Sequence, residues 1–211
     1  MTEQPLVTLS VSRFIDVTAS NAPAPGGGSV SALVGSLACA LAAMVGNLTL
    51  NKKKYEAVQE DMTRLVTRAT ALMDTLRSLV DEDTEAFNRV MAAFALPKNT
   101  DSEKQARAAA IQQATIEATQ TPLRVLRTCA QAVELVETAR SMGNVNALSD
   151  TGVAAALLRA GAEGASLNIM INLGSITDQD LVDAIARECR QTLQEVQAAC
   201  DAILDKVRQA L

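Results

Sequence analysis

The sequence predicts an all-α fold, a bundle of about six to seven long antiparallel helices. Aromatic residues make up only 2% of the chain, and Ala, Leu and Val supply most of its apolar surface. This composition favours helices over strands. Apolar residues also recur at steps of three and four over long segments, and no segment shows the two-residue period of a strand. With 211 residues and no linker-like stretch, we expect a single domain, residues 1–211.

The first helices are expected on either side of a loop rich in proline and glycine. A short amphipathic helix is predicted over residues 10–20. Four of its residues are expected to face inward: Val11, Phe14, Ile15 and Ala19. A second helix, from about Gly28 to Leu50, is apolar nearly all round, which predicts a central position. It approaches a membrane-spanning length, but its small and polar residues make it weakly hydrophobic, so we expect a buried helix and no membrane partner.

The third predicted helix carries the most regular pattern. From Val58 the apolar positions follow steps of four and three, through Met62, Leu65, Ala69, Leu72, Leu76 and Leu79. The next step falls on Asp83. The pattern then resumes at Phe87, at Val90 or Met91, and at Phe94. An acid therefore occupies a position where the spacing requires a core residue.

Three further helical segments complete the predicted bundle. Thr100 and Glu103 have the form of a capping box, and their helix should run to Thr121, where Pro122 kinks or restarts it. The restarted helix is expected to end near Met142.

A helix rich in small residues then spans about Asp150 to Leu173, and residues 177–180 cap the last helix. The apolar seam of that last helix includes Leu181, Ile185, Cys189, Val196, Cys200, Ile203 and Val207. Because such long helices outrun the width of a small globule, dimerisation through their exposed seams is expected.

Composition excludes several kinds of function. The net charge of −5 argues against a nucleic-acid partner. The chain has no histidine, so acid–base chemistry must come from other side chains. The four cysteines (Cys39, Cys129, Cys189 and Cys200) form no CxxC pair, and their scatter predicts no metal site. No signal-peptide pattern opens the chain, so we expect reduced thiols in a cytoplasmic protein.

The glycine-rich turn is the first candidate binding element. It comprises Pro25, Gly26, Gly27, Gly28 and Ser29. Neither the lysine of a phosphate loop nor a preceding strand is present, so a mononucleotide cradle is not expected. The first N–H groups of the following helix can bind an anion or a carbonyl oxygen. Alternatively, the glycines permit a tight turn and Ser29 caps the helix.

Asp83 is the first candidate for acid–base chemistry. A carboxylate on an apolar seam is desolvated, which raises its pKa unless a cation pairs with it. Such a group suits proton transfer or the binding of a cationic substrate. The alternatives are an ion pair with an arginine and an exposed turn in which residues 81–85 are simply solvated. Asp81 and Glu85 are the second and third candidates.

Polar residues that could contact a ligand also occur later in the chain. The loop 143–150 and its edge contain Asn144, Asn146, Ser149 and Asp150. They could bind a polar ligand, although Ser149 or Asp150 could equally cap the following helix. Asn168 lies four residues before Asn172 on one helical face, where the two could hydrogen-bond a heterocycle or satisfy one another across helices.

The densest basic cluster, Lys52, Lys53 and Lys54 followed by Tyr55, would attract a polycarboxylate, although a lone charge run is more often a solvated face.

Four segments together resemble the cyclodeaminase/cyclohydrolase family. They read PAPGGGSVSAL at 23–33, NKKKYEAV at 51–58, LVDEDTEAFNRVMAAFALPKNT at 79–100 and GNVNALSDTGVAAALL at 143–158. The resemblance extends along essentially the whole chain, in order. It implies an all-helical, dimeric fold, which agrees with the composition and periodicity.

The resemblance implies a tetrahydrofolate derivative as substrate, with no cofactor. The stand-alone cyclohydrolases of this family interconvert 5,10-methenyl- and 10-formyltetrahydrofolate, and the wording of the lysine and acidic segments is more similar to theirs. The cyclodeaminases release ammonia from 5-formiminotetrahydrofolate, and this remains the alternative. A third possibility is a non-catalytic helical dimer that binds folate.

The resemblance also implies a role for each group of candidate residues. Asp83 would stabilise the amidinium cation of the methenyl group and transfer protons. Lys52–Lys54 would attract the glutamate tail, and the glycine turn would hold the pterin edge or a carboxylate. Together with the 143–150 loop, these elements are expected to form the walls of one folate site.

Overall fold

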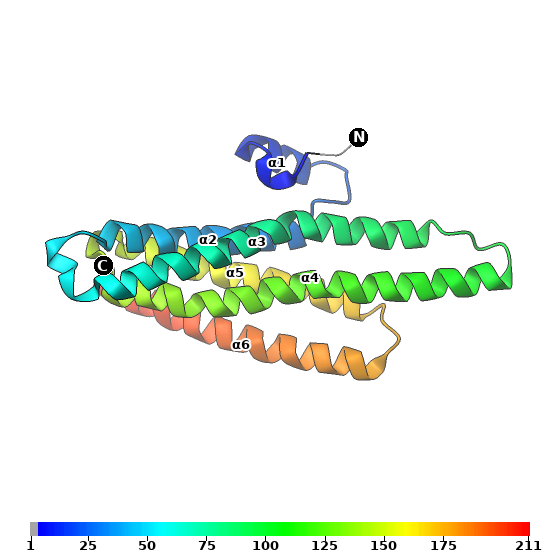
Figure 1. The fold of residues 1–211 in the computed structure, drawn as a ribbon. Coiled ribbons are helices and arrows are strands. Elements are labelled where there is room, and N and C mark those ends of the chain that lie inside the picture. The colour runs from blue at the N-terminus through cyan, green and yellow to red at the C-terminus, as the bar shows by residue number, and fades with distance from the viewer. Residues whose placement is uncertain (1–3) are drawn as a thin grey trace.

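The computed structural model describes residues 4–211, and all the regular structure in that range is helical. Five long helices form the body: α2 (Gly27–Thr49), α3 (Gln59–Phe94), α4 (Asp101–Met142), α5 (Leu148–Leu173) and α6 (Gln179–Ala210). Before them come the short η1 (Leu6–Thr8) and α1 (Val11–Thr18), and the turns η2 (Lys53–Val58) and η3 (Val145–Ala147) join longer helices. The all-α prediction is confirmed (Figure 1).

The central position of α2 is also confirmed. It packs against α3 and α5, with further contacts to α4. Small residues allow these close approaches: a Cβ on Gly35 would touch the Cys129 sulfur and the Leu76 methyls, and one on Gly161 would meet the backbone of Ser31. Among residues 4–211, α2 is the one helix long and apolar enough to span a membrane. The helices that pack around α2 bury much of that apolar surface.

The seam of α3 follows the predicted positions up to Leu79, with Met62, Leu65 and Leu76 fully buried. Beyond Asp83 the prediction is partly wrong. The buried residues there are Ala86 and Ala93, whereas Phe94 is 47% exposed. Figure 1 shows the reason: α3 and α4 extend together past the end of α2, so this part of α3 packs against α4 alone. Small residues suit that two-helix contact.

Pro122 neither kinks α4 into two helices nor restarts it, contrary to the prediction. The helix is continuous across it, and Pro122 itself is buried. A proline removes one backbone hydrogen bond, at a cost of about 3 kcal/mol or more in a helix interior. Here Leu123, Val125 and Leu126 are buried in the core on the following turn. We attribute the continuity of α4 to this packing.

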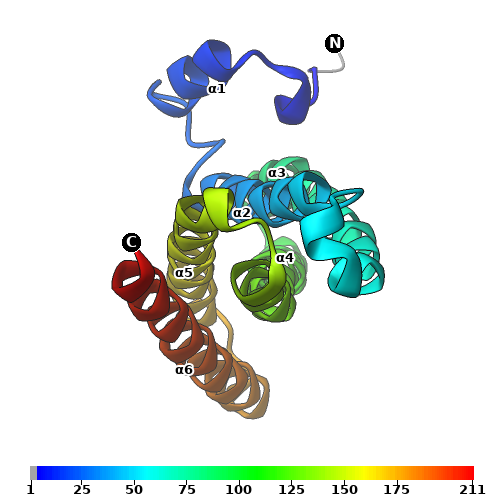
Figure 2. The ribbon, with the colours of Figure 1, turned by 90° about the vertical axis from the view of Figure 1, so that its left-hand side faces the viewer.

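The four residues of the first helix that were predicted to face inward all line the cavity between α1 and α2, but three of them are exposed and do not pack against the core. Val11 is 79% and Ile15 is 59% exposed, and Ala19 is exposed as well. Phe14 alone packs against the core. Figure 2 shows why: α1 stands off from the bundle rather than lying on it. An apolar cavity of about 610 Å³ lies between this arm and α2, with Val30, Leu33 and Val80 on its inner wall.

The helix caps agree with the sequence at two ends and differ at a third. Thr100 and Glu103 form both hydrogen bonds of the capping box, and the Asp178 side chain accepts from the Leu181 N–H. However, α5 begins at Leu148, so Ser149 and Asp150 lie inside its first turn and cap nothing. Instead, the chain passes directly from the turn η3 into α5. The predicted core positions of α6 from Ile185 to Val207 are buried.

Candidate active site

The glycine turn packs directly against the Asp83 carboxylate. A Cβ added to Gly28 would overlap the carboxylate oxygens of Asp83, so only glycine fits at this position while Asp83 keeps its place. The turn contains no glycine in the left-handed region. Its glycine at position 28 is therefore explained by close approach between α2 and α3, and not by an unusual backbone conformation.

Ser29 joins the two helices at the same point. Its hydroxyl donates to the Val80 carbonyl at 2.9 Å and to Asp83 Oδ2 at 3.0 Å, and it lies 3.4 Å from the Thr84 hydroxyl. The residue that caps α2 is Gly26, and no side chain bonds there. The expectation that Ser29 caps the helix is therefore wrong. A fully buried hydroxyl at this position instead fixes the orientation of the Asp83 carboxylate.

The environment of Asp83 perturbs its acidity. Burial raises the pKa of the Asp83 carboxyl above its usual range, while hydrogen bonds from the side chain and backbone of Ser29 lower it in part. The backbone N–H belongs to the first turn of α2, where the helix dipole favours a negative charge. The negative charge at the N-terminus of α2 is therefore the Asp83 carboxylate, which belongs to α3. No ion pair joins Asp83 to a cation within residues 4–211, so the arginine alternative is not observed.

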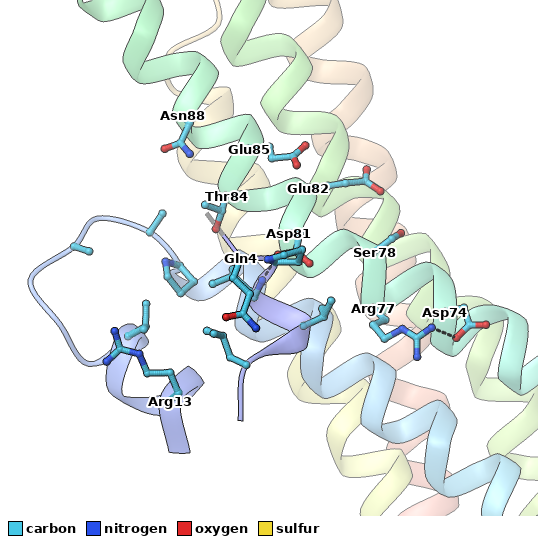
Figure 3. A pocket seen from close by; sticks show the side chains of 18 residues that line it. Gln4, Arg13, Asp74, Arg77, Ser78, Asp81, Glu82, Thr84, Glu85 and Asn88 are labelled. Atoms are coloured by element: carbon cyan, nitrogen blue, oxygen red, sulfur yellow. Dashed lines mark hydrogen bonds and ion pairs between the residues drawn. The ribbon is translucent and has the colours of Figure 1, made fainter. Parts of the chain in front are cut away.

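The other two acidic candidates have different surroundings. Asp81 Oδ1 accepts a hydrogen bond of 2.5 Å from the Leu6 N–H and so fastens the N-terminal arm to α3. Glu85 is exposed. Both line a cleft of about 1030 Å³ between the arm and α3, to which Arg13 and Arg77 contribute guanidinium groups (Figure 3). Asp83 does not line this cleft, because its side chain is directed toward α2.

Two more predicted residues lie near the glycine turn. A Cβ on Gly27 would contact the Asn168 amide nitrogen at 3.4 Å, which places the end of α5 beside the start of α2. The Asn168 amide donates to the Gly164 carbonyl within its own helix. Pro25 is buried and lines the cleft beside Glu85. We call this region, Pro25–Ser29 with Asp83 and Asn168, the glycine end.

Asn144 lies at the opposite end of α2, where its side chain holds the structure together. Its amide donates to the Leu48 carbonyl at 3.1 Å, and its N–H donates to the Thr49 hydroxyl at 2.8 Å. The Tyr55 hydroxyl accepts from the Val145 N–H at 3.0 Å and approaches Asn144 Oδ1 at 3.4 Å. These bonds tie together the end of α2, the turn η2 and the start of η3, and they engage the Asn144 side chain that was predicted to bind ligand.

The lysines nearby are free of such bonds. Lys52, Lys53 and Lys54 are exposed, and none forms an ion pair with any residue in 4–211. Lys54 lies over the Tyr55 ring, 5.5 Å from its centroid. Asn146 and Ser149 are exposed too, and Asp150 is partly buried. We call Lys52–Tyr55 with residues 144–150 the lysine end.

The two ends do not form one site within this chain, which corrects the sequence-based expectation. The 23 residues of α2 separate them, a distance of about 35 Å along the helix. Figure 1 shows the lysine end at the left-hand tip of the bundle and the arm that covers the glycine end near its middle. The structure therefore brings together Asp83, Asp81, Glu85, Asn168 and the glycine turn, and leaves the lysines and the 144–150 loop apart.

Sequence reasoning missed the N-terminal arm as part of the candidate site. Arg13 faces the cleft from α1, and residues before it complete the wall. No local signal distinguishes Arg13 from any other exposed arginine, because its role follows from where the arm is fastened. Thr84 was missed as well, although it directly follows Asp83. In the part of the chain that the structure describes, no three Asp, Glu or Cys side chains gather as a metal site would require.

Comparisons with known proteins agree with this arrangement. The family described as formiminotransferase-cyclodeaminase matches residues 10–191. A methenyltetrahydrofolate cyclohydrolase from Methylorubrum extorquens is 40% identical over 94% of this chain and 96% of its own length. A formimidoyltransferase-cyclodeaminase from Rattus norvegicus is 35% identical over 96% of this chain, which spans 37% of that longer protein.

A solved structure extends the likeness to three dimensions. The crystal structure of formiminotetrahydrofolate cyclodeaminase from Thermotoga maritima superimposes with a TM-score of 0.79, at 34% identity, over 97% of this chain and 96% of that one. Sequence and fold therefore point to the same relatives over nearly the full chain. This chain belongs to the formiminotransferase-cyclodeaminase family.

Proposed function

We propose that this protein is a methenyltetrahydrofolate cyclohydrolase of folate one-carbon metabolism, which interconverts 5,10-methenyltetrahydrofolate and 10-formyltetrahydrofolate. The observation that carries the proposal is the Asp83 carboxylate, held by Ser29 against Gly28 with its pKa raised by burial. The cyclohydrolase relative supports the choice of reaction, because it matches nearly end to end at 40% identity.

The chemistry needs one group that attracts a cation and accepts a proton. The methenyl bridge is an amidinium cation, and ionised Asp83 stabilises it by charge in a partly desolvated setting. Water adds to the bridge carbon and gives one proton to Asp83, which leaves a neutral carbinolamine. The carbinol O–H then loses its proton as the formyl C=O forms, the C–N5 bond breaks and N5 gains a proton. The proton on Asp83 returns to solvent, so the cycle closes.

The raised pKa of Asp83 suits this cycle. A carboxylate with an ordinary pKa is a weak base near neutral pH, and burial makes Asp83 a better proton acceptor. Ser29 engages Oδ2 of this carboxylate, and the other oxygen, Oδ1, lies against Gly28 at the start of α2. Asn168 and the backbone of Gly27 lie close enough to contact the same ligand.

A specific observation favours a second candidate, the cyclodeaminase. The solved relative of similar length, at a TM-score of 0.79, acts by that name on formiminotetrahydrofolate. Its reaction expels ammonia from a tetrahedral carbon, and the same carboxylate could serve both reactions. Geometry alone does not separate them, because each needs a cation-stabilising acid near one carbon.

The purified protein incubated with each substrate separates the two. Loss of the methenyl chromophore faster than its spontaneous hydrolysis supports the cyclohydrolase, whereas ammonia released from 5-formiminotetrahydrofolate supports the cyclodeaminase. Asp83→Asn should lower the turnover by about 10²–10⁴-fold. Asp205→Asn, the same change at an exposed ion pair on α6, should leave it unchanged. Turnover of neither substrate by the wild-type protein would favour a folate-binding module.

We further propose a cytoplasmic homodimer that requires no cofactor. All four cysteines are free and buried, which suits a reducing compartment. Burial raises the pKa of the Cys39 thiol to about 12, so this thiol is unreactive at neutral pH. The dimer is supported by large exposed apolar residues along α2 and α5. Sedimentation of the purified protein measures its mass directly.

A further inference from the structure

We propose that Ser29 and Thr84 form a proton relay, which carries the proton accepted by Asp83 to solvent in the cleft between the N-terminal arm and α3. This inference rests on the proposed function and deepens it, because it assigns a route to the proton whose return to solvent closes the catalytic cycle. Thr84 acts through Ser29, so it is a positioning residue and not a catalytic one.

The Asp83 carboxylate is enclosed on the sides that its own chain provides. Oδ1 lies against Gly28, and Oδ2 accepts from the Ser29 hydroxyl at 3.0 Å. The Asp83 side chain is half-buried, and it does not line the cleft. A substrate that pairs its cationic bridge with this carboxylate covers the part that remains exposed. A proton accepted by Asp83 therefore needs a route through the protein.

Three oxygen atoms form a continuous path from this carboxylate to the cleft. Asp83 Oδ2 lies 3.0 Å from Ser29 Oγ, which lies 3.4 Å from Thr84 Oγ1. Ser29 is fully buried, whereas Thr84 is partly exposed and lines the cleft. Figure 3 shows Thr84 on the α3 wall of this cleft, between Asp81 and Asn88. The path thus begins at a carboxylate that the cleft does not reach and ends at solvent.

The Thr84 hydroxyl is free of the backbone bond that helical threonines commonly make. On the same helix, Thr67 and Thr75 each donate to the carbonyl four residues earlier, at 3.0 Å. Within residues 4–211, Thr84 makes no such bond to the Val80 carbonyl, which accepts from Ser29 at 2.9 Å instead. The Thr84 proton is therefore available to Ser29 on one side and to solvent in the cleft on the other.

Hydroxyl groups can pass a proton along because each of them both donates and accepts. The proton on Asp83 Oδ2 passes to Ser29 Oγ, the Ser29 proton passes to Thr84 Oγ1, and the Thr84 proton passes to water. Three O–H bonds break and three form, so the net change is one proton moved from the carboxyl to water. Ser29 then donates to the carboxylate, which is the hydrogen bond in this structure. Rotation of the two hydroxyls resets the relay.

The cleft is suited to receive this proton. The charged residues that line it are Asp74, Asp81, Glu82, Glu85, Arg13 and Arg77. Because the acids outnumber the arginines, the net charge of the walls is negative and attracts cations. Glu85 is exposed there, so a proton that reaches this carboxylate exchanges with bulk solvent.

Substitution of Thr84 tests the relay through kcat. Thr84→Val keeps the shape of the side chain and removes its hydroxyl, so kcat should fall about tenfold while KM stays unchanged. Thr84→Ser keeps the hydroxyl and should retain most of the wild-type kcat. Thr75→Val, the same change at an exposed threonine of α3, is the matched control and should have no effect. An unchanged kcat for Thr84→Val, or an equal fall for Thr84→Ser, would overturn the relay.

Thr84→Ala separates proton transfer from packing. It removes the methyl group as well as the hydroxyl, and the space that opens to the cleft admits a water molecule, which can bridge Ser29 to solvent. Thr84→Ala should therefore have a higher kcat than Thr84→Val, although it is the larger truncation. A packing role requires the reverse order, and that result would overturn the relay.

The solvent isotope effect gives a further readout on whichever folate the wild-type protein turns over. When the relay is interrupted, proton release limits turnover, so the ratio of kcat in H₂O to kcat in D₂O should be larger for Thr84→Val than for the wild type. Equal ratios would contradict the relay. Wild-type protein inactive on both folates would refute the proposed function and the relay together, whereas an active wild type with an unaffected Thr84→Val variant would refute the relay alone.

Discussion

The two ends of α2 carry polar residues of opposite character. At the glycine end, Asp83 is pressed into α2 so closely that Gly28 cannot gain a single carbon, and Ser29 holds its carboxylate. At the lysine end, the buried polar groups of Asn144 and Thr49 bond to the backbone and to each other. The charges there, on Lys52–Lys54, are left in solvent.

We therefore expect different roles for the two ends: proton transfer at the glycine end and electrostatic attraction of the ligand at the lysine end. A partly buried carboxylate with a raised pKa is costly for the fold and useful for proton transfer. Exposed lysines cost the fold almost nothing and act on charged ligands through space, in a way that salt weakens. We therefore expect substitutions at the glycine end to change turnover, and substitutions at the lysine end to change either stability or substrate capture.

Among substitutions that keep the Asp83 carboxyl, the largest effect is expected for Gly28→Ala. The new methyl would displace the Asp83 carboxylate, and a shift of about 1 Å in a catalytic group can cost about 10²-fold in rate. Turnover should fall by about that factor in steady-state assays. Gly174→Ala, outside the glycine end, is the matched control, because its Cβ would meet only the Ile171 oxygen at 3.5 Å. Equal activity of the two variants would remove the close contact from the mechanism.

Asn144→Ala should be the most destabilising change at the lysine end. It removes the donor to the Leu48 carbonyl and the acceptor of the Asn146 N–H. We expect a loss of about 1–3 kcal/mol in the free energy of unfolding, measured with urea. Asn146→Ala, at an exposed side chain, should change it by less than about 0.5 kcal/mol. Similar losses for both variants would contradict the structural role of Asn144.

The combined change of Lys52, Lys53 and Lys54 to Gln should raise KM and leave kcat nearly unchanged. Loss of three positive charges weakens capture of a carboxylate tail, by about tenfold at low ionic strength. The difference from wild type should shrink as salt is added. Lys98→Gln, an exposed lysine between α3 and α4, is the control and should have no effect. A fall in kcat instead would place the lysines in the chemical step.

The smallest effect concerns the stability of Asp83→Asn. Because burial raises the folded-state pKa of Asp83 above its unfolded value, ionisation of this group destabilises the fold. That penalty is absent below the ordinary carboxyl range and is complete once pH exceeds the folded-state pKa. The Asn variant should therefore be more stable than wild type at pH 7, with the difference closing below about pH 4. A variant less stable than wild type at pH 7 would show that the Ser29 hydrogen bonds outweigh burial.

Much of the fold could be predicted from spacing alone. The seam from Met62 to Leu79 and that of α6 are set by the helical period, and the caps at Thr100 and Asp178 depend on neighbours within one turn. The same helical spacing identified Asp83 as an acid at a position where a core residue is expected. Predictions failed where distant packing decides: Pro122 stays helical because its surroundings are buried, and Val11 and Ile15 stay exposed because the arm stands away from the bundle.

The sequence by itself determined an all-helical chain, a family and an acid out of place on an apolar seam, since each of these depends on residue type and on intervals of a few residues. The tertiary structure alone decided what surrounds that acid. The contact of Asp83 with Gly28 and Ser29 joins residues more than fifty positions apart. It also decided that α2 runs unbroken from the glycine turn to the lysines, which keeps the two motifs a helix length apart.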